Sequence, residues 1–171
     1  MNLALHQATT ADLPLLIQLY AEMDGHAPLS IEQGGELFTQ IQQVPNYRIY
    51  LAYGKNSDND DSPIGTFSLI DVPTFMHSGY HKYAVIDAVS IRPHLRGQGL
   101  GTTMMQQAIQ LCADRGCYKV QLSSNRHRTQ AHDFYKSLGF QQHGWSFLLT
   151  LHPSHIHSTP PEKAHNLKSK I

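Results

Sequence analysis

A glycine-rich turn between a predicted strand and a predicted helix is the segment of this sequence best suited to chemistry. It reads Arg-Gly-Gln-Gly-Leu-Gly-Thr over residues 96–102. Such a turn leaves several backbone N–H groups without partners, and the dipole of the following helix adds a partial positive charge. Glycine has no Cβ that would keep a ligand away from the backbone. The turn is therefore predicted to bind a phosphate or a pyrophosphate.

Two common nucleotide-binding patterns do not fit this turn. A P-loop needs a lysine after its last glycine, and here Thr102 follows Gly101. The dinucleotide pattern Gly-x-Gly-x-x-Gly needs its third glycine at position 102, which is again threonine. A nucleotide-binding protein is therefore disfavoured, and the pattern that remains is Arg-x-x-Gly-x-Gly.

Two blocks of the chain resemble the GNAT superfamily of N-acetyltransferases. Arg96–Gly101 is similar to the family's acetyl-CoA pyrophosphate loop, [Gln/Arg]-x-x-Gly-x-[Gly/Ala]. Ala131–Phe140 is similar to its last helix, Asn-x-x-Ala-x-x-Phe-Tyr-x-x-x-Gly-Phe, although Asn125 lies six residues before Ala131 rather than three. Arg115–Val120 resembles a stretch of glucosamine-6-phosphate N-acetyltransferases and related small-molecule enzymes, among which we also place aminoalkylphosphonate acetyltransferases.

The resemblance implies that acetyl-CoA is the co-substrate, with no metal ion. The pyrophosphate is expected on the N–H groups of the turn, helped by a threonine hydroxyl, and the pantetheine arm is expected to pair with strand backbone. The residues expected to bind acetyl-CoA are Val89, Ser90, Ile91, Arg96, Gly97, Gln98, Gly99, Leu100, Gly101, Thr102, Asn125 and Tyr135.

The resemblance also implies that Tyr135 is the general acid that protonates the departing CoA thiolate. Tyrosine has a reference pKa of about 10 and a thiol about 8.5, so a neutral tyrosine can donate as charge builds on sulfur. Asp87 is the first candidate base, because it interrupts an apolar strand and a buried carboxylate there is costly without a task. Asp71 and Glu22 are weaker candidates. A packing role for Tyr135, a structural role for Asp87 and a reaction without a base stay open.

These groups need a mixed α/β frame to position them. The pattern predicts one domain over residues 1–151, of the GNAT-like α+β class, with about six to seven strands in a mixed sheet and about four flanking helices. Tyr83–Ile91 is expected to be buried on both faces, and capping boxes are expected at Thr9–Asp12 and Ser30–Gln33. Strands are expected at 3–6, 47–53, 64–70, 83–91, 117–123 and 145–151, and helices after Thr9, after Ser30, and at 101–115 and 129–138.

Composition narrows the class of function. The 171 residues contain 13 Lys and Arg against 13 Asp and Glu, so no global field favours nucleic acid. No apolar run is long enough for a membrane, and no signal peptide is evident. Cys112 and Cys117 are expected to pack in the core, which favours a cytoplasmic protein. The 12 histidines match no compact metal site, and residues 152–171 are expected to form a flexible polar tail.

The predicted function is acetyl transfer from acetyl-CoA to the primary amine of a small molecule by direct attack in a ternary complex. The acceptor pocket is expected among residues 22–29, 71–82, 87 and 144–147, whose aromatics, histidines and acids suit a small cationic amine or amino sugar. A homodimer is possible, because family members often pair. The alternatives are an acyl-CoA sensor without activity and an acetyltransferase acting on protein N-termini or lysines.

Overall fold

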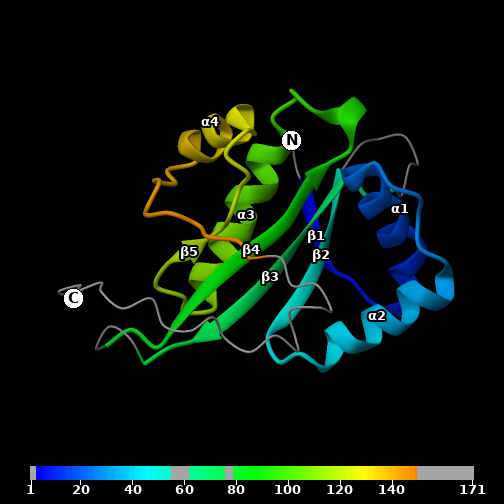
Figure 1. Ribbon diagram of the computed structural model, residues 1–171, viewed down its shortest axis with the longest axis horizontal. Coiled ribbons are helices and arrows are strands. Elements are labelled where there is room, and N and C mark those ends of the chain that lie inside the picture. The colour runs from blue at the N-terminus through cyan, green and yellow to red at the C-terminus, as the bar shows by residue number, and fades with distance from the viewer. Residues whose placement is uncertain (1–2, 55–61, 76–78, 150–171) are drawn as a thin grey trace, which may run out of the picture. The chain divides into compact units, whose positions relative to one another are not determined.

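A computed structural model describes residues 3–54, 62–75 and 79–149 of the chain (Figure 1). Residues 1–141 form one compact unit, and residues 142–149 belong to a second, separate unit. The expected domain boundary at residue 151 and the expected polar tail over 152–171 lie outside the described residues. Among the helices that are described, none is long and apolar enough to cross a membrane.

The first unit is built on a mixed sheet whose strands follow one another in chain order. Antiparallel pairs join β1 (Leu3–Gln7), β2 (Tyr47–Gly54), β3 (Gly65–Pro73) and β4 (Lys82–Ile91), and β5 (Val120–Gln121) joins β4 in parallel. The α+β class with a mixed sheet is therefore confirmed. Over the described residues, however, this sheet has five strands, fewer than expected.

The expected last strand over residues 145–151 accounts for part of the difference. Residues 145–149 form neither helix nor strand, and residues 150 and 151 lie outside the described residues. Trp145 and Phe147 are 85% and 93% exposed. A strand needs a neighbour that takes its backbone hydrogen bonds, and the described residues of the second unit provide none. A short apolar run alone does not fix a conformation.

Four α-helices of the described chain flank the sheet, in agreement with the sequence. They are α1 (Leu13–Asp24), α2 (Ile31–Gln43), α3 (Leu100–Asp114) and α4 (Thr129–Ser137). Both expected capping boxes are present. The Thr9 N–H donates to the Asp12 carboxylate at 2.8 Å, and Ser30 and Gln33 exchange backbone-to-side-chain hydrogen bonds of 3.1 and 3.2 Å.

Two hydrophobic clusters pack on opposite faces of the sheet. Tyr50 and Ala52 of β2 join the cluster beneath α3 and α4, whereas Ile49 and Leu51 join the cluster beneath α1 and α2. This division follows the alternation of side chains along a strand. Figure 1 shows the α1–α2 pair and the α3–α4 pair on either side of the strands. The two faces are named below by these helix pairs.

The expectation that β4 is buried on both faces is wrong. Ala84 and Ile86 are fully buried, but Asp87, expected to be a buried carboxylate, is exposed. The apolar strand residues packed beneath α1 and α2 all come from β2, so this helix pair leaves β4 uncovered on its face. The uncovered face puts Asp87 in contact with solvent.

A buried ionic cluster ties α3 to the sheet. Asp71 of β3 is 3% exposed and pairs with Arg115, which follows α3, at 2.9 Å and with Arg48 of β2 at 3.5 Å. Its hydrogen bond to Asp71 raises the pKa of the Arg115 guanidinium. Since one carboxylate serves two guanidinium groups with little exposed surface, its removal would leave both without their counter-charge.

The substitution Asp71→Asn should lower the free energy of unfolding by about 3 kcal/mol, the typical cost of breaking a buried ion pair from one side. Urea unfolding followed by circular dichroism measures this loss. Asp114→Asn is the matched control, because Asp114 is exposed and accepts its hydrogen bond from Gln110 within α3. Equal stabilities of the two variants would contradict a structural role for Asp71.

Candidate active site

The second half of β4 has an edge that no strand of the described sheet occupies. β4 pairs with β5 only at Ala84–Val120 and Val85–Gln121. On its other side β4 pairs with β3, where Ser68 is opposite Asp87 and Thr66 is opposite Ser90. Two steps along β3 therefore correspond to three steps along β4, so β4 has one extra residue here. This β-bulge includes Ala88, whose φ of 51° is left-handed. Residues 86–91 therefore present backbone groups along an open edge of β4.

The predicted anion-binding turn follows this open edge directly. A short 3-10 helix, Pro93–Leu95, leads into it, and Gly99 caps α3 with φ 77° and ψ −3°. No hydrogen bond within the described part of the chain uses the N–H groups of residues 97–102 as donors. The Arg96 Nε donates to the Ile91 carbonyl at 3.0 Å, which fixes the turn to the end of β4. The turn thus has the free donors that a phosphate needs.

Arg92 anchors the same junction, a role that no local pattern in the sequence indicates. Its guanidinium pairs with Glu22 of α1 at 2.7 Å and donates to the Pro63 carbonyl at 2.8 Å. Glu22, a weaker candidate base, is therefore held in an ion pair. Gly65 allows the close approach of β3 here, because a Cβ at this position would overlap the Ser90 carbonyl. A long-range ion pair and a close backbone approach leave no local pattern in a sequence.

Tyr135 of α4 is half-buried on the α3–α4 face. Its ring packs against Phe134 and Phe140, with centroids 5.3 and 5.9 Å apart. Burial raises the pKa of Tyr135, the positive charge of Arg128 opposes this rise, and the negative charge of Asp87 adds to it. The Tyr135 hydroxyl has no hydrogen-bond partner among the described residues. It is a protonated donor available to a ligand.

Asp87 lies on the opposite face of the sheet from Tyr135. It pairs with Ser68, which pairs with Ile49, and residues paired across strands point to the same face. Ile49 packs beneath α1 and α2, so Asp87 belongs to the α1–α2 face. The negative charge of Asp87 contributes to the raised pKa of Tyr135. The predicted acid and the predicted base therefore belong to opposite faces of the sheet, and their roles stay predictions.

Asn125 orders the loop between β5 and α4. Its side-chain oxygen accepts from the His127 N–H at 3.0 Å, and its carbonyl accepts from the Arg128 N–H at 3.0 Å and contacts the His132 ring at 2.9 Å. The hydroxyl of the preceding Ser124 is buried without a partner among the described residues. Such a group marks a place where a water molecule or a ligand completes the bonding. The cofactor contact expected of Asn125 stays a prediction.

Neither cysteine is prepared to act as a nucleophile. Cys112 is fully buried on α3, and burial raises the pKa of its thiol to about 12. Cys117 is partly buried, its sulfur lies 3.7 Å from an Asp71 oxygen, and burial raises its pKa as well. Thiols with raised pKa values stay protonated near neutral pH, whereas the thiolate is the nucleophile. Asp71 is committed to the ionic cluster.

An open hollow of about 640 Å³ lies beside α1 and the segment that follows it. Its lining includes residues from the segment 22–29, one of those in which the acceptor pocket is expected. Residues 76–78 of that pocket lie outside the described residues, and 144–147 belong to the second unit. The hollow is lined by Pro14, Ile17, Gln18, Ala21, Glu22, Gly25, His26, Pro28 and Leu29.

Comparisons with known proteins place the chain in one family. Residues 14–140 match the model of the Acetyltransferase (GNAT) family, so the chain belongs to the GNAT acetyltransferases. It is 34% identical over 80 residues to a glucosamine 6-phosphate N-acetyltransferase of Trypanosoma brucei brucei, covering 47% of this chain and 52% of that protein. The chain spans 38–52% of the length of the curated relatives it matches.

Solved structures resemble the chain over most of its length. A protein of Agrobacterium tumefaciens str. C58, provisionally assigned as an acetyltransferase, has a TM-score of 0.77 and 31% identity, covering 86% of this chain and 99% of its own. A Trypanosoma brucei acetyltransferase has a TM-score of 0.72 and 25% identity, covering 88% and 100%. The resemblance therefore includes the turn and α4 within one continuous fold.

Gly99→Ala should weaken acetyl-CoA binding about tenfold, because a left-handed residue with a Cβ costs about 1–2 kcal/mol. Isothermal titration with acetyl-CoA measures this change. Gly116→Ala is the matched control, since Gly116 has the same left-handed φ of 77° but follows the other end of α3, away from the turn. Equal affinities of the two variants would show that the shape of the turn does not determine binding.

Proposed function

We propose that this protein transfers the acetyl group of acetyl-CoA to the primary amine of a small molecule by direct attack in a ternary complex. The observation that carries the proposal is the continuity of three features. An open strand edge leads into a turn with free N–H groups, and Tyr135 lies within electrostatic reach of the same strand. These features match the extended arm, the pyrophosphate and the departing sulfur of one acetyl-CoA molecule.

The open edge and the turn divide the binding of acetyl-CoA between them. Amide groups of the pantetheine arm pair with the backbone of Val89 and Ile91, as an added strand does. The N–H groups of residues 97–102 and the Thr102 hydroxyl take the pyrophosphate, aided by the dipole of α3. Arg96 keeps its guanidinium on the Ile91 carbonyl and so orders the turn rather than doing chemistry.

The two faces of the sheet separate the arrival of the amine from the departure of the thiol. The amine approaches on the α1–α2 face, where Asp87 lies. Its nitrogen forms a bond to the acetyl carbon, its proton passes to Asp87 directly or through water, and the carbon–sulfur bond breaks. Tyr135, on the other face, returns a proton to the sulfur, so both charges are neutralised.

The hollow favours an amine without a phosphate group. No lysine or arginine belongs to its lining, and Glu22 of the lining is paired with Arg92. A phosphorylated amino sugar would find no free cation there, whereas a small cationic amine or an unphosphorylated amino sugar would meet apolar walls and a carboxylate.

The test is release of free CoA thiol from acetyl-CoA across a panel of amines, polyamines, amino sugars with and without phosphate, and peptides. Release that depends on a small amine supports the proposal. Acetyl-CoA binding without any release would indicate a sensor, and release with peptides alone would indicate a protein acetyltransferase. Absence of acetyl-CoA binding would overturn the proposal.

Tyr135→Phe should lower kcat about 100-fold with little change in the KM for acetyl-CoA, because general acid catalysis contributes factors of about 10²–10⁴. Burial raises the pKa of Tyr135 above its ordinary value, so its protonated, active form persists to higher pH and is lost only above that pKa. Wild-type activity should therefore not decline through this group between pH 7 and about 10. Tyr83→Phe, at the far end of β4, is the control and should retain full activity.

Asp87→Asn should lower kcat at least about tenfold at neutral pH, because the amine then loses its proton without help. The loss should shrink as the pH rises and more of the acceptor is unprotonated. A pH–rate profile on the best acceptor measures both effects. Asp133→Asn removes an exposed carboxylate of α4 and serves as the control. An unchanged profile for Asp87→Asn would remove this residue from the mechanism.

A further inference from the structure

Glu22 belongs to two features of the molecule at the same time. It lies in the last turn of α1 and is the one carboxylate in the lining of the hollow. It also pairs at 2.7 Å with Arg92, the residue that directly follows β4 and its open edge. A single ion pair therefore connects the hollow with the end of the strand along which acetyl-CoA is proposed to bind.

The hydrogen bonds at Glu22 occupy only one of its two carboxylate oxygens. Oε1 accepts from Arg92 Nη1 at 2.7 Å and from Gln18 Nε2 at 3.1 Å. Oε2 accepts no hydrogen bond from any residue that the structure describes. A carboxylate can accept about four hydrogen bonds, shared between its oxygens. Since 31% of its side chain is exposed, Glu22 can still bind a donor that enters from solvent.

Arg92 is fixed by hydrogen bonds besides its ion pair. Its Nε donates to the Pro63 carbonyl at 2.8 Å, its backbone N–H donates to the Ile64 carbonyl at 2.9 Å, and its side chain is 12% exposed. The guanidinium therefore holds the Glu22 carboxylate in place before a ligand arrives, which lowers the entropy lost on binding. Because it also balances part of the negative charge, a ligand at Oε2 gains about as much as one hydrogen bond to a charged group contributes.

The rest of the lining suits a short apolar chain that ends in a cation. An ammonium group has three donors and no acceptor, so a carboxylate oxygen is its preferred partner. Methylene groups next to it gain free energy from contact with apolar walls. No lysine or arginine of the lining opposes a cation. The apolar residues of the lining are Pro14, Ile17, Ala21, Pro28 and Leu29.

We propose that Glu22 selects the acceptor, because its free Oε2 binds an ammonium group that is not the one acetylated. The nitrogen that attacks the acetyl carbon must be unprotonated, whereas the nitrogen bound to Glu22 stays charged. The acceptor class is therefore an amine with a second amino group, such as a diamine or a polyamine. Glu22 neither gives nor takes a proton in the reaction. This inference rests on the proposed acetyl transfer and names the substrate class of the same site.

The first measurement compares α,ω-diamines of increasing length, each with the monoamine of the same length, by kcat/KM. The wild type should prefer its best diamine over the matched monoamine about tenfold, as one hydrogen bond to a charged group predicts. Glu22→Gln keeps the shape and an acceptor for Arg92 but removes the negative charge, so this ratio should fall to about one. The KM for acetyl-CoA should stay within about twofold.

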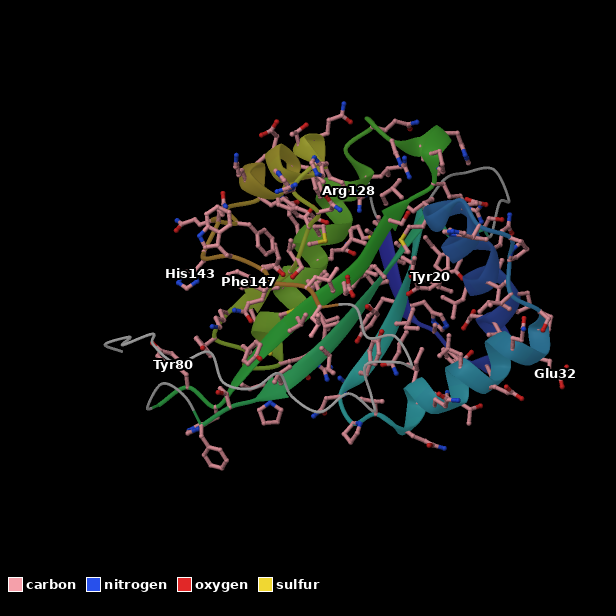
Figure 2. The ribbon with its side chains drawn as sticks, viewed as in Figure 1. Tyr20, Glu32, Tyr80, Arg128, His143 and Phe147 are labelled. Atoms are coloured by element: carbon pink, nitrogen blue, oxygen red, sulfur yellow. The ribbon has the colours of Figure 1, made fainter. Side chains whose placement is uncertain are left out.

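Two further variants test the cause of the change. Glu32→Gln is the matched control, since Glu32 is a carboxylate in the first turn of α2 outside the lining of the hollow (Figure 2). It should keep the wild-type ratio. Glu22→Gln combined with Arg92→Gln removes both charges of the ion pair and should again give a ratio of about one. A restored ratio would attribute the loss in Glu22→Gln to an unpaired Arg92 and contradict the proposal.

Binding without turnover separates this inference from the acetyl transfer on which it rests. Calorimetric titration with the same diamines, with and without CoA, measures affinity alone, because CoA carries no acetyl group. Glu22→Gln should weaken the affinity about tenfold, and Glu32→Gln should not. A weakened affinity without thiol release from any amine would contradict the proposed function but support the site at Glu22. Equal ratios or equal affinities in wild type and Glu22→Gln, or no binding of any diamine, would overturn the inference.

Discussion

The site depends on one interruption in the hydrogen bonding of the sheet. β4 and β5 share only two residue pairs, and the bulge at Ala88 bends the rest of β4. Backbone groups along the open edge must find partners in water or in a ligand, because unpaired groups cost free energy once they are buried. An extended ligand with amide groups meets this need. The turn follows this edge, and the proposed acid and base lie near it.

The charges of the protein fall into two groups that differ in their surroundings. The groups that join distant parts of the fold are paired: Glu22 with Arg92 at 2.7 Å, and the buried Asp71 with Arg115 at 2.9 Å and with Arg48 at 3.5 Å. Asp87 and Arg128 are exposed, and neither side chain makes a hydrogen bond or ion pair with a described residue. The two charges shift the pKa of the half-buried Tyr135 in opposite directions.

Two predictions failed for the same physical reason. β4 reads as a strand buried on both faces, and residues 145–149 read as a strand, because both contain consecutive apolar residues. A run of apolar residues indicates that the segment favours burial, but it does not indicate which element of the fold will cover it. In the structure α1 and α2 pack over β2 and leave Asp87 exposed, and the described residues of the second unit offer no strand for pairing.

The sequence by itself determined the elements whose signals are local. The capping boxes at Thr9 and Ser30, the four helices and the glycine turn follow from short-range hydrogen bonds and backbone sterics, which residues within one turn of chain specify. Only the tertiary structure decided that Asp87 and Tyr135 lie on opposite faces of the sheet, that Arg92 pairs with Glu22 of α1, and that the Arg128 side chain has no partner among the described residues. These contacts join residues as many as 70 positions apart. No local sequence pattern predicts such contacts, because only the packing of the folded chain brings these residues together.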